Sequence, residues 1–272
     1  MQGIRRVPTL LGGALRLIEV LKATVVHVIR QETGRSALGF VSAMTRPLIL
    51  LATFLVIIEV MGVRGIAIRG NTVTFLMTGI ICFLTHVTAV QKVAAALRKA
   101  RGFMHHAPAS LALFVFAQAV GALYLNLLAG LGVWLVAELS GHGLGILHPA
   151  GMILPYLLSW ASGVGVGMIL LALSHHAPTA AEVTAAVYTR VQFFTCGKFW
   201  AANIMPIGLV DYAVWNPLLH TIDQMRGAAF VNYTPQHTEL AYPAIFTAVV
   251  LVIGFMLEWR LRHGLSLSAL RR

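Results

Sequence analysis

The sequence predicts an all-α membrane protein that crosses the bilayer six times. Of its 272 residues, 58% are hydrophobic and only 11% are charged, and a soluble domain of this length has too small a core for so many apolar side chains. Six apolar runs are each long enough to cross a hydrocarbon core of about 30 Å. The predicted spans cover residues 47–63, 72–90, 110–137, 151–173, 183–204 and 242–259.

The net charge of +11 is divided unevenly between the two sides of these spans. If both termini share one side, seven Lys and Arg residues precede the first span, four lie between the second and third spans, and four follow the last. The segments on the opposite side hold only Arg64, Arg69 and Arg226. Basic residues favour the cytoplasmic side of a membrane, so both termini are predicted to be cytoplasmic, and the partner of the excess charge is anionic lipid rather than nucleic acid.

Residues 1–46 form an N-terminal segment that precedes the first span. Apolar residues within 10–31 recur at helical spacing, and charged residues occupy the remaining positions. This pattern predicts an amphipathic helix that lies on the cytoplasmic membrane surface. A soluble amphipathic helix packed on a partner is the alternative.

Two further patterns concern the middle of the chain. The stretch "QKVAAALRKARGFMHHAP" predicts a basic, helical, cytoplasmic extension of the second span that ends at Pro108. In the fourth span, Ser159, Gly163 and Gly167 repeat every four residues, which predicts a close approach of a neighbouring helix backbone.

The fifth span contains two basic residues, Arg190 and Lys198. On one ideal helix they would lie about 12 Å apart along the axis. Each would cost about 2.5–3.5 kcal/mol if it faced lipid at the bilayer centre. They are therefore expected either to face a polar interior or to lie near the two ends of the span and extend to the membrane surfaces.

A polar segment, about residues 206–235, separates the last two spans and is expected outside the cytoplasm. Its core reads "WNPLLHTIDQMRGAAFVNY". Asn216-Pro217 is expected to start a helix, Asp223 and Arg226 to pair at i, i+3, and Gly227 to break the helix. Residues 47–260 are taken as one transmembrane domain, followed by a cytoplasmic tail, 261–272.

No catalytic or metal site is expected. The eleven His residues show no His-Glu-x-x-His spacing, and the adjacent pairs 105–106 and 175–176 point about 100° apart on a helix, so they are interpreted as solvated loop residues. The Gly197-Lys198 pair is followed by Phe199 rather than Ser or Thr, so it is not a phosphate-binding loop. If the protein uses ATP and Mg²⁺, another chain must bind them.

Three blocks of sequence resemble the ABC-2 type permeases that export bacterial capsular polysaccharide. The first lies before the last span, with the matching positions Trp215, Asn216, Pro217, Leu218, His220, Asp223, Arg226 and Tyr233. The second is "GRSALGFVSAMTRPLIL", matched at Gly34, Leu38, Gly39, Phe40, Ala43 and Pro47. The third is "RVQFFTCGKFW", matched at Arg190, Phe193, Phe194, Cys196 and Gly197. The blocks occur in order along nearly the whole chain. Departures are Ser42, where the family often has Trp, and Arg46, where it often has an acidic residue.

The resemblance implies the fold and the partners of such an exporter. It implies an ABC-2 (type V ABC exporter) fold in the bacterial inner membrane, with the polar segment forming two short helices that re-enter the periplasmic side of the bilayer. It also implies a homodimer with two copies of a separate ATPase, and a lipid-linked, usually anionic polysaccharide as substrate. A periplasmic co-polymerase and an outer-membrane export protein are the further partners implied.

The candidate site residues follow from charge in the membrane and from this resemblance. Candidates for the substrate path are Arg46, Arg190, Lys198, Trp215 and Tyr233. Candidates for the re-entrant motif are Asn216, Pro217, His220, Asp223 and Arg226. Candidates for coupling to the ATPase are Arg98, Arg101, Phe103, His105, His106 and Pro108.

Three alternatives to capsule export remain open at this stage. The same architecture could export O-antigen or another lipid-linked glycan. A membrane-embedded glycolipid enzyme is a second possibility, although no catalytic motif supports it. A channel or secondary transporter is a third, but the sequence shows no internal repeat.

Overall fold

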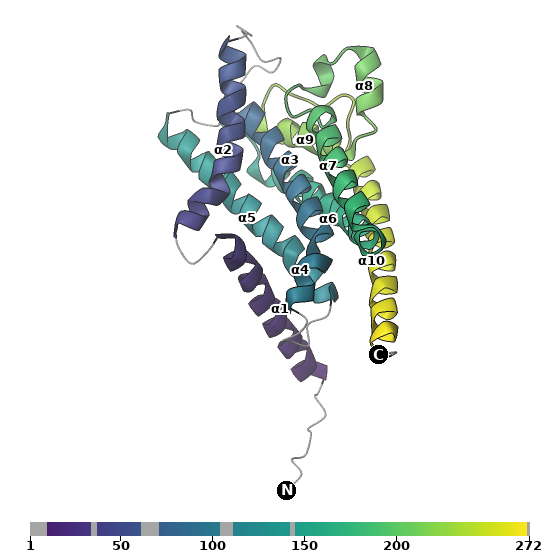
Figure 1. Ribbon diagram of the computed structural model, residues 1–272. Coiled ribbons are helices and arrows are strands. Elements are labelled where there is room, and N and C mark those ends of the chain that lie inside the picture. Colours follow the sequence, from purple (N-terminus) through teal and green to yellow (C-terminus); the bar gives the residue numbers. More distant parts are fainter. Residues whose placement is uncertain (1–9, 34–36, 61–70, 104–110, 142–144, 271–272) are drawn as a thin grey trace.

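The computed structural model describes residues 10–33, 37–60, 71–103, 111–141 and 145–270, and every regular element within these ranges is a helix (Figure 1). The elements in chain order are α1 (Leu10–Thr33), α2 (Ala37–Val60), α3 (Thr72–Ala94), α4 (Ala96–Phe103), α5 (Leu111–Leu139), the 3-10 helix η1 (Pro149–Met152), α6 (Ile153–His176), α7 (Pro178–Thr195), the 3-10 helix η2 (Ala202–Ile204), α8 (Ile207–Ala213), α9 (Pro217–Ala229) and α10 (Ala241–Leu270).

Among the described residues, four helical stretches are long and apolar enough to cross a membrane. They are Thr72–Ala94, Leu111–Leu139, Pro149–His176 and Ala241–His263, which correspond to the second, third, fourth and sixth predicted spans. A shorter apolar helical stretch, Thr45–Ile57, lies in α2. The all-helical membrane class is therefore confirmed. That the first and fifth predicted spans also cross the membrane, which would make six crossings, stays a prediction.

Helix α3 is the most deeply buried of the four long apolar helices, and it packs chiefly against α6 and then α5. The small residues of α6 allow this contact, as the sequence predicts. A Cβ atom added at Gly163 would lie 2.5 Å from the backbone oxygen of His86, and one added at Gly167 would lie 2.9 Å from that of Val90. Nothing larger than glycine fits without separating the two helices.

The predicted amphipathic helix near the N-terminus is present as α1, which packs along α5. Val28, on the apolar face, is 1% exposed and faces Gly121 of α5. In Figure 1, α1 and α4 lie at the end of the bundle away from α8 and α9. The position of α1 on a membrane surface stays a prediction.

The helix of the fifth predicted span ends nine residues earlier than expected. The apolar run predicts a helix to residue 204, but α7 ends at Thr195, and Gly197 has a φ of 72°. A glycine in the left-handed conformation just after the last helical turn is a common helix terminator. The prediction of a continuous helix through Lys198 is therefore wrong. Residues 196–240 are named here the α7–α10 connection, and this segment is longer than the polar segment predicted at about residues 206–235.

Two helix ends near the C-terminus also differ from expectation. Asn216 caps α9 and Pro217 is its first residue, as predicted, but the helix continues past Gly227 to Ala229. The last helix, α10, continues to Leu270, so the predicted tail from residue 261 begins as an extension of the last span rather than as a separate segment.

Candidate functional site

The α7–α10 connection is attached to the end of α7 through Asn216. The Asn216 side-chain oxygen accepts a hydrogen bond from the Leu218 N–H at 2.9 Å, which caps α9. Its amide nitrogen donates to the Gln192 side-chain oxygen at 2.6 Å and to the Thr195 hydroxyl at 2.9 Å. One side chain therefore both starts α9 and joins it to the last turn of α7.

Arg226 makes a second attachment to the same place. Its guanidinium donates to the backbone oxygens of Gly197 (2.8 Å), Lys198 (2.7 Å) and Trp200 (2.9 Å), and it lies over the Phe75 ring at 3.8 Å from the centroid. The residues after the αL turn cannot bond within a helix, so Arg226 supplies donors that their carbonyl groups otherwise lack. Burial lowers the pKa of Arg226 to about 10, which leaves it protonated at neutral pH.

Asp223 organises the other side of α9. Its carboxylate accepts hydrogen bonds from the Tyr233 hydroxyl and, at 2.8 Å, from the Thr238 hydroxyl. Burial and the neighbouring Asp223 charge raise the pKa of Tyr233, so the phenol stays protonated and donates. The predicted ion pair between Asp223 and Arg226 is wrong, because each side chain bonds to residues far away in the sequence instead.

His220 and Trp215 complete the motif. His220 accepts from the Glu239 N–H at 3.0 Å through Nδ1 and donates to the Val214 oxygen at 2.8 Å through Nε2. Trp215 is 79% exposed, while its backbone oxygen accepts from the Tyr242 hydroxyl at 2.8 Å. The buried motif residues hold the α7–α10 connection in shape, and Trp215 is the motif side chain that faces outward.

The position of Lys198 differs from both predictions, a polar interior and a position near the membrane surface. Its side chain is buried, 1% of the residue being exposed, and its ammonium nitrogen lies 3.8, 3.3 and 4.6 Å from the ring centroids of Phe83, Phe193 and Phe199. It also donates to the Phe193 backbone oxygen. The charge is held by aromatic faces and a carbonyl group, so Lys198 neither extends to a membrane surface nor faces an open path here.

The remaining path candidates lie on three different elements. Arg190 is exposed on α7, Tyr233 is buried beside Asp223, and Arg46 is exposed on α2. Their common role in a substrate path stays a prediction. The ATPase-coupling candidates are described only in part: Arg98 pairs with Glu182 of α7, the side chains of Arg101 and Phe103 lie outside the described set, and so do residues 104–110 altogether.

A buried polar network inside the helical bundle was missed by the sequence analysis. His86 of α3 is fully buried and contacts the Ser159 oxygen at 3.0 Å, the Ser162 hydroxyl at 3.1 Å and the Tyr188 hydroxyl at 2.8 Å. These partners lie on α6 and α7. The network satisfies polar groups between three helices, and the apolar run around His86 gave no indication of its partners.

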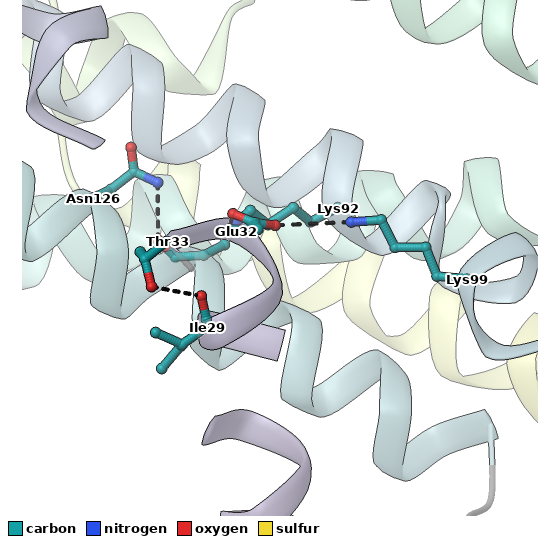
Figure 2. Close-up of polar contacts among 7 residues, drawn as sticks. Ile29, Glu32, Thr33, Lys92, Lys99 and Asn126 are labelled. Carbon is teal, nitrogen blue, oxygen red and sulfur yellow. Dashed lines mark hydrogen bonds and ion pairs between the residues drawn. The ribbon is translucent and has the colours of Figure 1, made fainter. Parts of the chain in front are cut away.

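A second region that the sequence analysis missed is a cavity of about 450 Å³ between α1, α2, α3, α4 and α5, named here the basic cavity. Its polar lining residues are Glu32, Thr33, Arg46, Thr88, Gln91, Lys92, Lys99 and Asn126. Glu32 lies 2.5 Å from the Lys92 ammonium group and 3.8 Å from that of Lys99, and Figure 2 shows these three side chains pointing toward one another. Sequence spacing places Lys92 and Lys99 two helical turns apart, but it does not reveal Glu32.

The fold and these two regions define a multi-pass helical membrane protein with a polar connection folded at one end of its bundle. No family model matches the chain. It is 26% and 25% identical to two proteins of Escherichia coli, each described as "Polysialic acid transport protein KpsM". Each match extends over 261 residues, which is 92% of this chain and 98% of the relative. This similarity confirms the resemblance to capsular polysaccharide permeases and the prediction of a transport protein rather than an enzyme.

Proposed function

We propose that this chain is the membrane-spanning permease subunit of an ATP-driven ABC transporter that exports a lipid-linked capsular polysaccharide across the bacterial inner membrane. The observation that carries the proposal is the similarity to polysialic acid transport proteins over 98% of their length. A match of that extent covers the apolar helices and the α7–α10 connection alike. It therefore concerns the whole transport unit rather than a shared hydrophobic helix.

The permease acts as a homodimer with two copies of a separate ATPase that binds ATP and Mg²⁺. The absence of a phosphate-binding loop from the sequence supports a separate ATPase. Both termini and α4 are then cytoplasmic, and the α7–α10 connection is periplasmic, in accord with the charge distribution. A periplasmic co-polymerase and an outer-membrane export protein carry the polymer further.

The polymer path lies where two copies meet, and Arg190 is the residue we assign to it first. Arg190 is exposed on α7 beside Val187, Val191 and Phe194, which are also exposed. A cation on such an apolar face is disfavoured in lipid, and an anionic polymer would supply its counter-charge. Weak, repeated charge contacts suit transport, because a polymer must leave each site that it enters.

The assignment of Arg190 is tested by Arg190→Gln, with Arg260→Gln on the exposed surface of α10 as the matched control. A path role predicts normal membrane abundance of both variants and reduced surface polysaccharide for Arg190→Gln alone. If Arg190 merely extends to the membrane surface, Arg190→Gln exports at the wild-type rate. Surface polysaccharide is measured by anti-glycan labelling, and abundance by membrane immunoblot.

The function itself is tested by expressing the chain in a host whose own capsule permease gene is deleted, with and without a co-expressed candidate ATPase subunit. Restored surface capsule that requires both proteins supports the proposal. Restored O-antigen instead of capsule assigns the permease to the alternative substrate. Glycolipid turnover by the purified chain without an ATPase contradicts transport.

A further inference from the structure

The basic cavity carries an unbalanced positive charge. Glu32 stands between Lys92 and Lys99, so one carboxylate serves two ammonium groups. Arg46 adds a third base, and among the described ion pairs it has no carboxylate partner. With three bases and one acid, the cavity has a net positive charge that favours binding of a further anion.

The two remaining bases are also the accessible ones. The Lys92 side chain is 10% exposed and is engaged with Glu32, whereas the Lys99 side chain is 39% exposed and lies 3.8 Å from the same carboxylate. Arg46 is exposed at the cavity wall. A ligand that enters would therefore meet Arg46 and Lys99 first, while the Glu32–Lys92 pair ties α1 to α3 behind them.

The walls of the cavity indicate an amphiphile rather than a small soluble anion. Beside the charged groups, the lining includes Pro47, Leu84 and Leu125. These residues belong to the apolar helical stretches of α2, α3 and α5, so apolar side chains border the cavity together with the charged groups. A volume of about 450 Å³ holds a headgroup and the first carbons of its chains.

We propose that the basic cavity binds the phosphate group of a lipid from the leaflet on the side of α1, with Arg46 and Lys99 as its direct contacts. Arg matches the geometry of phosphate with two parallel donors, and Lys contributes a point charge. If the proposed function holds, this lipid is the carrier of the glycan, and the cavity is where the carrier docks before export. That last step rests on the proposed function, whereas lipid binding does not.

Binding is measured on the purified full-length chain in detergent by native mass spectrometry, with short-chain phosphatidic acid as probe and the matching diacylglycerol as the uncharged comparison. The test variant carries Arg46→Gln and Lys99→Gln. The control variant carries Arg30→Gln and Arg98→Gln, which remove the same charge from exposed bases on α1 and α4 outside the cavity. We expect the test variant to lose roughly tenfold or more in affinity, on the scale of one hydrogen bond to a charged group, and the control to bind like the wild type.

A substitution expected to increase affinity adds a second test. Glu32→Gln removes the one acid of the cavity and should tighten phosphatidic acid binding, and a thermal transition of this variant shows whether it is folded. If Glu32→Gln does not fold, the comparison of the test variant with the control variant decides alone. Equal losses in the test and control variants would overturn the site. Inorganic phosphate that competes at the same concentration as the lipid would assign the cavity to a soluble anion and overturn the lipid assignment.

Export measurements separate this inference from the proposed function. If phosphatidic acid binds as expected while the chain fails to restore any surface glycan, the lipid site stands and the transport proposal fails. If the chain restores capsule while the test and control variants bind lipid equally, transport stands and the lipid site fails.

Discussion

Arg226 shows how one buried side chain can fix the end of a helix that it does not belong to. Its guanidinium satisfies the carbonyl groups of Gly197, Lys198 and Trp200, which follow α7. The resemblance places Arg226 in a family motif, and the structure supplies the reason for the residue type, because only arginine offers several donors in one planar group. The motif is therefore interpreted chiefly as structural support, with Trp215 as its exposed member.

We expect Arg226→Met to destabilise the protein by at least about 3 kcal/mol, because several buried carbonyl groups lose a charged donor that contributes about 1.5–3 kcal/mol for each bond. The shift should lower the thermal midpoint in detergent by roughly 6 °C or more. Arg190→Met, which removes an exposed base from α7, is the control and should change stability by no more than about 0.5 kcal/mol. Similar midpoints for the two variants would contradict this account of Arg226.

Among the elements, α3 and α6 depend on glycine for their separation. We expect Gly163→Ala to cost about 1–3 kcal/mol, the range for overpacking, because the new methyl group would lie 2.5 Å from the His86 oxygen. Gly208→Ala in α8 meets nothing within 4 Å and should be neutral or slightly stabilising, since alanine favours helix. Thermal unfolding of both variants checks the difference, and a stabilised Gly163→Ala would show that the helices separate without cost.

The structure of the α7–α10 connection predicts which of its positions are accessible to a thiol reagent. In a chain with Cys82→Ala and Cys196→Ala, single cysteines are placed from Leu218 to Phe230 and treated with a membrane-impermeant thiol reagent on intact cells. Leu218 and Ile222 are 0% exposed and should stay protected, whereas Gln224 and Ala228 are half-buried and should react. A cysteine at Val231, which is 71% exposed, is the positive control. Uniform labelling from 218 to 230 would mean a solvated loop and contradict the folded connection.

At the scale of the whole molecule, the sequence predicts what depends on long apolar runs and fails where distant residues decide. The apolar runs at 72–90, 110–137, 151–173 and 242–259 all correspond to helices, and Asn216-Pro217 starts α9 as its local chemistry requires. The end of α7 was missed because the apolar run continues through Gly197, whose positive φ breaks the helix without changing hydropathy.

The site was predicted less completely for the same reason. Spacing suggested that Asp223 would pair with Arg226, but Tyr233 and Thr238 compete for the carboxylate from outside the helix. The basic cavity joins Glu32 to Lys92 and Lys99 across more than fifty residues of sequence, a pairing that no local pattern contains. The partners of these side chains could be identified only from the fold.

Coupling to the ATPase is a prediction for the assembled transporter. Arg98 is already paired with Glu182, so the contacts with the ATPase are expected from the basic loop that follows it, with Phe103 as an apolar anchor. Phe103→Asp should reduce co-purification of the ATPase and abolish export, because a charge would be buried in the contact. Arg260→Gln, on the exposed surface of α10, is the control and should retain the ATPase. Unchanged assembly and export for Phe103→Asp would remove this loop from the interface.

The attachment of Arg226 to the end of α7 also sets an order of events during synthesis. The guanidinium bonds to the Trp200 carbonyl group, 26 residues earlier in the chain, and a ribosome that adds about 5–20 residues per second needs roughly one to five seconds to make that interval. Until then the carbonyl groups after α7 need water as their partner, so this end of α7 must wait at a hydrated surface. Arg226, which is positively charged, must reach the same side of the membrane before it can bind these carbonyl groups. We therefore expect the nascent chain to pass through an open intermediate that proteases on that side can cleave until Arg226 binds these carbonyl groups.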